Sequence, residues 1–165
     1  MRGWAGFSRD GVYRYSLGRR WATGGRRVCF CLLNPSTADA RVLDPTLTRC
    51  LGYARGWGFA CMDVVNIFAL RSTDPAALKA APDPIGRGND AAIRRCAARG
   101  DLVVAGWGAH GVLHARHERV LGLLARHGPV HCLGTTARGL PRHPLYLRKD
   151  LEPALLTAPS STAGF

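Results

Sequence analysis

Four segments of the chain have the apolar pattern of buried β-strands. Residues 27–33 and 61–70 are long runs of mainly apolar side chains, which is typical of strands covered on both faces. Residues 101–107 and 129–133 are shorter runs that glycine and proline bound. These four segments predict the central strands of a sheet.

Helical periodicity fills the intervals between the predicted strands. Asp44 has the position of an N-cap, followed by proline, for a helix that runs to about Trp57. Asn89 or Asp90 is expected to cap the next helix, and residues 110–126 form a third. Alternating strands and helices predict an α/β fold with a parallel sheet, whose ligands bind outside the carboxyl ends of the strands.

The remaining segments are predicted to be short or irregular. Residues 10–22 alternate large and polar side chains, which indicates a hairpin at a sheet edge with its arginines facing solvent. Residues 71–87 predict a loop with one helical turn, and a short helix is expected after the proline-broken loop at 135–146. We expect one domain over residues 1–157 and a flexible tail over residues 158–165.

The charge of the chain indicates the class of its partner. The 165 residues include 23 Lys and Arg against 11 Asp and Glu, a formal net charge of +12, and only Lys79 and Lys149 are lysines. Guanidinium groups suit phosphate and base edges, so we expect DNA or RNA as the partner. A GC-rich genome also enriches arginine, so charge alone predicts a class and no more.

Cofactors, membranes and disulfides are not expected. The six cysteines lie mostly among apolar neighbours without a C-x-x-C pair, which indicates reduced core residues. His110, His114 and His117 share one face of the predicted helix, but without an H-E-x-x-H order a solvated basic face is favoured over a metal site. No signal-peptide core and no membrane-length apolar run occur, so we expect a cytoplasmic monomer.

Two asparagines stand at or near the ends of the first two predicted strands. Asn34 precedes Pro35 and is placed to orient a water or a substrate oxygen, although Asn-Pro is also an ordinary turn starter. Asn66 lies in an apolar run, where a buried amide without partners costs about 1 to 3 kcal/mol. A base edge supplies such partners, and so do neighbouring loops.

Two later segments carry candidate binding groups. His143 stands between Arg142 and a proline on a loop of restricted flexibility, where it can donate a hydrogen bond to a leaving group while Arg142 holds a phosphate. The alternative is an ordinary surface histidine. Gly108 lies in a strand-to-helix turn whose N–H groups suit an anion, with tight helix-to-strand packing as the alternative.

Several motifs of the chain form an ordered set that resembles a family of small bacterial and phage proteins without a described function. The resemblance covers roughly residues 10 to 150. The motifs are Leu32-Leu-Asn-Pro-Ser-Thr-Ala-Asp39, Asp44-Pro-Thr46 with Arg49, Val65-Asn-Ile-Phe-Ala-Leu70, Asn89-Asp90, Ala105-Gly-Trp-Gly108 and Pro141-Arg-His-Pro-Leu-Tyr146.

The order of these motifs also resembles, more distantly, the uracil-DNA glycosylase superfamily. The Asn34-Pro35 loop is similar to the loop that holds the attacking water there, and Asn66 is similar to the strand asparagine that reads the extruded base. His143-Pro-Leu145 resembles a closing His-Pro loop with a wedging leucine. The resemblance implies a three-layer α/β/α fold around a central four-stranded, mainly parallel sheet.

The same resemblance implies hydrolysis of the N-glycosidic bond of a damaged or modified base after that base is flipped out of DNA. Each implied role falls on a residue of this chain. The catalytic candidates are Asn34, Asp39, Asp44 and His143; the base-binding candidates are Asn66, Pro35, Phe68 and Trp107; the nucleic-acid-binding candidates are Arg142, Gly108, Leu145 and Tyr146.

Two other functions remain open. A noncatalytic reader of modified bases needs the arginine-rich surface and Asn66 but neither Asn34 nor a carboxylate. A small-molecule nucleoside or nucleotide hydrolase acts on its substrate with little dependence on polymer length.

Overall fold

The computed structural model describes residues 1–157. The strands are β1 (Arg2–Phe7), β2 (Arg14–Arg20), β3 (Arg27–Leu32), β4 (Cys61–Asn66), β5 (Leu102–Ala105), β6 (Val130–Cys132) and β7 (Ala154–Leu155). The helices are α1 (Pro45–Gly56), α2 (Pro75–Ala80), α3 (Asn89–Arg99) and α4 (Arg116–Ala125), with 3-10 turns η1 (Ala109–Ala115) and η2 (Pro144–Tyr146).

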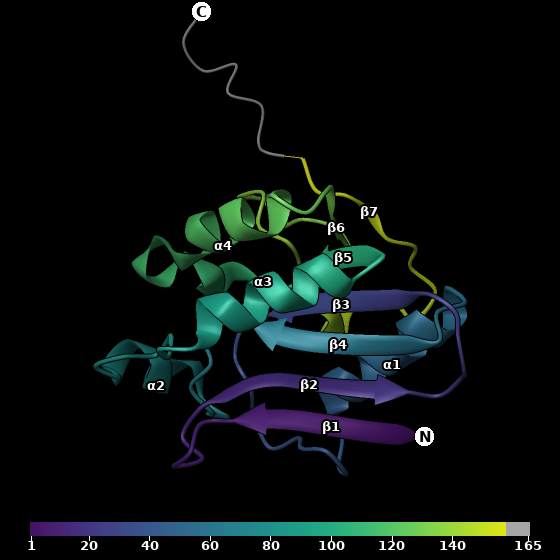
Figure 1. Ribbon diagram of the computed structural model, residues 1–165. Helices are drawn as coiled ribbons and strands as arrows, with labels where there is room; N and C mark the ends of the chain where they lie inside the picture. The colour runs from purple at the N-terminus through teal and green to yellow at the C-terminus, as the bar shows by residue number, and fades with distance from the viewer. Residues whose placement is uncertain (158–165) are drawn as a thin grey trace, which may run out of the picture.

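The fold is α/β, as predicted, with one mixed sheet in the order β1-β2-β4-β3-β5-β6-β7 (Figure 1). The four predicted strands are β3 to β6, and they pair in parallel at the centre of the sheet. The expectation of a four-stranded sheet was wrong, because β1, β2 and β7 add to it in antiparallel pairings. These added strands are partly exposed or very short, so their apolar pattern is weak.

The N-terminal hairpin lies earlier in the chain than predicted. Strand β1 pairs with β2 from Arg2 opposite Arg20, so the hairpin covers residues 2–20 and not 10–22. The expectation that its arginines face solvent was wrong for Arg14 and Arg19, which are each 2% exposed. The reason is the segment at 38–42, whose carbonyls receive these side chains: that of Ala38 accepts from Arg14, and those of Asp39 and Val42 accept from Arg19.

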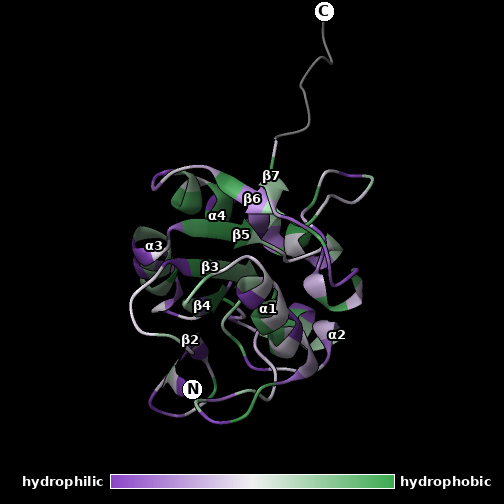
Figure 2. Ribbon diagram, turned by 90° about the vertical axis from the view of Figure 1, so that its right-hand side faces the viewer, coloured by the Kyte–Doolittle hydropathy of each residue, from purple (hydrophilic) through white to green (hydrophobic). Residues whose placement is uncertain are grey.

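The sheet separates two apolar cores. In β3, Val28 and Phe30 pack in the cluster that contains the buried side chains of α1. Cys29 and Cys31 pack on the opposite face, in the cluster that contains those of α3 and α4. Figure 2 shows the strands between α3 and α4 on one side and α1 on the other. This three-layer arrangement explains why the parallel strands are apolar on both faces.

Helix α1 begins as predicted, and α3 does not. Asp44 caps α1 by accepting the N–H of Leu47 at 2.9 Å, with Pro45 in the first turn. The N-cap of α3 is Gly88, without a side-chain hydrogen bond, so the predicted cap at Asn89 or Asp90 was wrong. The Asn89 side chain is fully buried and serves another purpose, described below.

The helix predicted over residues 110–126 is broken. His114 and Ala115 have φ values of 57° and 53°, which separate η1 from α4. The three histidines of this segment therefore do not share one continuous helix face. The short helix expected after the 135–146 loop is also absent from the described chain, which forms β7 there instead.

Two further expectations concern the C-terminal tail and membrane-spanning helices. The predicted tail at 158–165 lies outside the described residues. Within residues 1–157, no helix has both the length and the apolar character that crossing a membrane requires.

The order of the parallel strands places a crevice at one end of the sheet. From β3 the chain passes through α1 to β4 on one side, and β5 then pairs with the other edge of β3. The loops after β3 and β5 therefore diverge over opposite faces. Open α/β sheets bind ligands outside the carboxyl ends of the strands at such a switch point.

A disulfide joins β3 to α3 through Cys29 and Cys96, whose Cα atoms lie 6.1 Å apart. The expectation that all six cysteines are reduced was wrong for this pair. The other four cysteines are free and buried, and burial raises the pKa of Cys31 to about 12. The Cys31 thiol is therefore protonated at neutral pH.

We expect the disulfide to stabilise the fold by a measurable amount. Thiol titration of the unfolded, non-reduced protein should find only the four free cysteines. Because the bond links residues 67 positions apart, its reduction should lower the free energy of unfolding by about 2 to 4 kcal/mol. Urea unfolding with and without reductant measures this difference. The Cys96→Ala variant should show no such difference, and titration of all six thiols without reductant would contradict the pairing.

Candidate functional site

A small cavity of about 40 Å³ lies at the carboxyl ends of β3 and β4. Segments far apart in the sequence meet there, and they bring together four predicted site residues: Asn34, Asp44, Asn66 and His143. The complete lining is Arg14, Leu32, Asn34, Ser36, Asp44, Thr46, Leu47, Asn66 and His143. This convergence makes the cavity the candidate functional site.

Asn66 is the last residue of β4, and its side chain is held from within the protein. It is 2% exposed, and its Oδ1 accepts a hydrogen bond from Nη2 of Arg14 at 3.4 Å. Its main-chain carbonyl accepts a hydrogen bond from Nδ2 of Asn89 at 2.9 Å. The protein therefore supplies a partner for the oxygen of the buried side-chain amide and another for the main-chain carbonyl.

A polar network secures the chain where it leaves β4. The carbonyl of Ile67 accepts hydrogen bonds from Asn89 Nδ2 at 3.1 Å and from Arg116 Nε at 2.8 Å. Arg116 is itself buried and forms an ion pair with Asp90 at 2.6 Å. Buried carbonyls beyond the end of a strand lose their ladder partners, and these side chains replace them.

Asn34 anchors the loop that follows β3. Its Nδ2 donates to the carbonyl of Ser72 at 2.9 Å and to that of Pro35 at 3.2 Å. Both amide protons are thereby used within the protein. The oxygen Oδ1 is the atom left to bind a water or a ligand in the cavity.

The titratable side chains of the cavity are those of Arg14, Asp44 and His143. The Nδ1 atom of His143 accepts the N–H of Leu145 at 3.3 Å, so the proton of the neutral ring lies on Nε2. Burial lowers the pKa of His143, and the nearby carboxylate of Asp44 opposes this shift. The neutral imidazole is therefore favoured, with Nε2–H as a donor.

The glycines after β5 allow the His143 turn to lie against the strand ends. A Cβ atom on Gly106 would stand 3.2 Å from Leu32 Cδ2 and 3.2 Å from Pro144 Cδ. The N–H of Gly108 donates to the carbonyl of Pro141 at 2.8 Å. This N–H is thus occupied within the fold, which favours the packing alternative over phosphate binding for Gly108.

Other predicted residues lie away from the cavity. Asp39 accepts the N–H groups of Arg41 and Val42, each at 2.8 Å, and these hydrogen bonds lower its pKa. It stabilises a turn and does not line the cavity. Phe68 and Trp107 are 0% and 1% exposed in the core beneath α3 and α4, so neither offers its ring to a base in the cavity.

The remaining predicted residues lie beside the cavity or on the surface. Pro35 is buried, while Arg142 is exposed. Leu145 is half-buried and lines a neighbouring hollow, and Tyr146 is 89% exposed. The Leu145-Tyr146 pair thus stands at the surface, two to three positions from His143.

Two larger hollows flank the cavity. One of about 380 Å³ shares Ser36 with it and is lined by Arg71. The other, of about 640 Å³, shares Asp44 and is lined by Arg49 and Lys149. Each of the two hollows that share a lining residue with the cavity therefore carries at least one cationic side chain.

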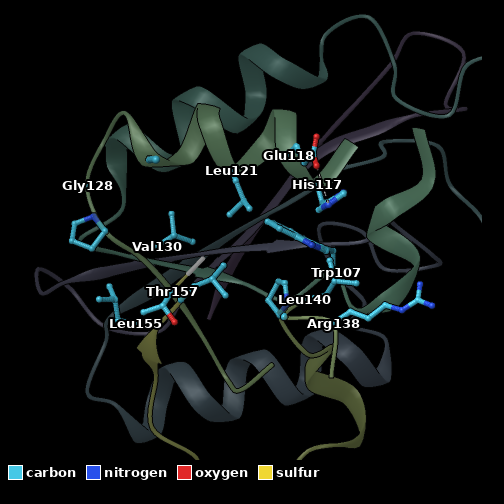
Figure 3. A pocket seen from close by; sticks show the side chains of 15 residues that line it. Trp107, His117, Glu118, Leu121, Gly128, Val130, Arg138, Leu140, Leu155 and Thr157 are labelled. Atoms are coloured by element: carbon cyan, nitrogen blue, oxygen red, sulfur yellow. Dashed lines mark ion pairs between the residues drawn. The ribbon is translucent and has the colours of Figure 1, made fainter. Parts of the chain in front are cut away.

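A separate cavity of about 490 Å³ lies between α4 and the loop at 138–141 (Figure 3). Its walls are mainly apolar, with Arg138 and Glu118 among its polar residues. Trp107 is its only member among the predicted site residues within the described chain.

Sequence patterns missed the roles of Arg14 and Asn89. Arg14 lies in an alternating segment that predicts an exposed hairpin, and its burial depends on tertiary contacts with the carbonyl of Ala38 and the amide of Asn66. Burial lowers the pKa of Arg14 to about 10. Asn89 shows the sequence signal of a helix cap, and its use as a donor to β4 depends on tertiary contacts.

Loss of the Asn89 amide should destabilise the fold. The Asn89→Ala substitution leaves the carbonyls of Asn66 and Ile67 with fewer donors, so the free energy of unfolding should fall by about 1 to 3 kcal/mol. Urea unfolding measures the change. Arg94→Ala, at an exposed position of the same helix, should change it by less than about 0.5 kcal/mol. Equal effects of the two substitutions would contradict the assigned role.

Burial of His143 predicts a pH-dependent stability. Its folded pKa lies below the ordinary value of 6.5, so the unfolded chain binds the proton more tightly. The stabilising contribution is present above pH 6.5 and is lost as the pH falls from there through the folded pKa. Urea unfolding at about pH 7.5 and about pH 5.5 should show a smaller decrease for His143→Gln than for the wild type. The exposed His110→Gln control should retain the wild-type decrease.

Comparison with known proteins identifies a family for most of the chain. The model of a family described as a protein of unknown function, DUF1643, matches residues 14–145. This segment contains every residue that lines the small cavity. No curated protein and no solved structure matches the chain. The chain therefore belongs to the DUF1643 family.

Proposed function

We propose that this protein is a DNA glycosylase-like hydrolase, similar to the uracil-DNA glycosylase superfamily, that binds nucleic acid and removes a damaged or modified base. One observation carries the proposal. Asn34, Asp44, Asn66 and His143, to which the order of the motifs assigns complementary roles, line the same cavity. They come from segments that only the tertiary fold brings together.

The available atoms suit hydrolysis of an N-glycosidic bond. Asn34 Oδ1 and the carboxylate of Asp44 accept hydrogen bonds from an attacking water. The neutral His143 donates from Nε2 to the departing base, where negative charge develops. Asn66 holds the base edge. Asp44 replaces Asp39 as the proposed carboxylate, because Asp39 does not line the cavity.

The surroundings of the cavity suit a polyanionic strand. Arg71 lies in one flanking hollow, and Arg49 and Lys149 lie in the other. A strand that crosses the cavity mouth from one hollow to the other meets cations on both sides, which makes its affinity salt-dependent. Tyr146 is exposed beside this path and is the proposed side chain that fills the place of the flipped base.

The proposed function requires the cavity to enlarge before a base can enter. A volume of about 40 Å³ accommodates a few water molecules and not a whole base. Ser36 and Asp44 separate it from the two larger hollows, since each lines both spaces. Entry of a base therefore requires the segment at 34–46 and the His143 turn to move apart. Closure around a bound base then excludes water from the reacting bond.

Glycosylase activity is tested with oligonucleotides that contain uracil, common lesions or hypermodified phage bases, followed by alkaline cleavage of abasic sites. Asp44→Asn should lower turnover by about 10²- to 10⁴-fold, because it removes the charged acceptor while asparagine still caps α1. Asp39→Asn is the matched control outside the cavity and should retain wild-type turnover. Asn34→Ala should lower turnover while DNA binding persists.

Absence of abasic sites with every substrate would contradict the hydrolase proposal. A reader of modified bases is the second candidate, because Asn34 already uses both amide protons to anchor its loop and is explained without a catalytic role. Salt-dependent binding to one modified base without cleavage would support the reader. Hydrolysis of mononucleosides with no dependence on polymer length would instead identify a small-molecule hydrolase.

A further inference from the structure

Arg14 is the one charged residue of the cavity that the proposed mechanism does not use. It reaches the cavity from β2, an antiparallel strand outside the parallel centre of the sheet. Its Nη1 donates to the carbonyl of Ala38 at 3.1 Å and its Nη2 donates to Asn66 Oδ1 at 3.4 Å, while its buried Nε has no partner among the described residues.

The contacts of the Arg14 guanidinium do not favour a role in stability alone. Among the described residues, no carboxylate forms an ion pair with Arg14, although it is only 2% exposed. A buried charge without a direct counterion carries a desolvation penalty that two neutral hydrogen bonds offset only in part. Strongly desolvated charges beside a cavity are typical of functional sites.

Arg14 determines the orientation of the Asn66 side-chain amide. A guanidinium has donors and no acceptor, so the end of the Asn66 amide that faces it is the oxygen. The amide is planar, and its Nδ2 then remains as the polar end for a ligand in the cavity. An asparagine whose side-chain amide can flip recognises either a donor or an acceptor. The amide of Asn66 offers the ligand N–H donors only.

We propose that Arg14 is a positioning residue that fixes the Asn66 amide, so that the cavity recognises a base through an oxo group and discriminates against a base with an amino group at that place. This inference rests on the proposed function to the extent that a base enters the cavity. It does not depend on hydrolysis. An amino group facing Asn66 Nδ2 would place two donors against each other and leave a buried donor unpaired.

The test compares fluorescently labelled single strands that differ only in one central base. One pair contains deoxyuridine or deoxycytidine, and the second contains deoxyinosine or deoxyadenosine, so that each pair exchanges an oxo for an amino group. Fluorescence anisotropy gives the ratio of the two dissociation constants within each pair. The wild type should prefer the oxo member by about tenfold.

Arg14 variants separate positioning from a purely structural role. Arg14→Gln supplies an amide that can both donate and accept, so the Asn66 amide can flip. The ratio of the two dissociation constants should then fall below about twofold. Arg14→Lys keeps a charged group that only donates, and it should restore part of the preference. Arg19→Gln is the matched control, because Arg19 is an equally buried arginine of β2 that bonds the carbonyls of Gly18 and Asp39 and does not line the cavity. It should keep the wild-type ratio.

The outcomes also separate this inference from the proposed function. A wild-type protein without oxo preference, or an Arg14→Gln variant that folds and keeps the full preference, overturns the role of Arg14 even if the protein cleaves DNA. If Arg14→Gln fails to fold, Arg14→Lys decides, since loss of all preference in that folded variant contradicts donor-only positioning. Oxo preference that depends on Arg14 without any cleavage supports the inference and removes the hydrolase proposal.

Discussion

The structure depends on satisfying polar groups at the place where β4 leaves the sheet. Both faces of the sheet are apolar there, so the amide of Asn66 and the carbonyls that follow it have no access to bulk water. Arg14 reaches Asn66 from the neighbouring strand, and Asn89 and Arg116 reach the carbonyls from the helical layer. Unpaired groups of this kind each cost about 1 to 3 kcal/mol. The hairpin, α3 and α4 are therefore tied to one point, and that point borders the cavity.

Further internal contacts hold the loops of the candidate site in place. The Asn34 loop is tied to Ser72, and the His143 turn lies against Gly106, where no side chain intervenes. Each of these contacts fixes a loop at the carboxyl end of a parallel strand. Preformed placement of donors and acceptors lowers the free energy that a site must spend on reorganisation during binding and reaction. For a base to enter as proposed, the segments that close the small cavity must still separate.

The parallel centre of the fold follows from local sequence, and so does much of the site. Apolar runs predicted β3 to β6, and proline after Asp44 predicted the start of α1. Because parallel strands end at the same edge of a sheet, residues at those ends were expected to converge, and Asn34 and Asn66 do so. The sequence offered both Asp39 and Asp44 as catalytic carboxylates. Only the backbone path decides that Asp39 closes a turn while Asp44 faces the cavity.

The parts that sequence did not predict depend on contacts between distant elements. An alternating strand such as β2 has the same pattern whether its polar side chains meet solvent or a distant segment, and the buried Arg14 meets the carbonyl of Ala38 and the amide of Asn66. Local patterns thus describe strands that are covered on both faces by apolar cores, and they describe poorly a strand whose polar side chains a distant segment covers. In this protein the poorly described strand delivers the guanidinium that bonds the Asn66 amide. Under the proposed function, loops from the parallel sheet supply the reacting groups, and the antiparallel hairpin orients the amide that faces them.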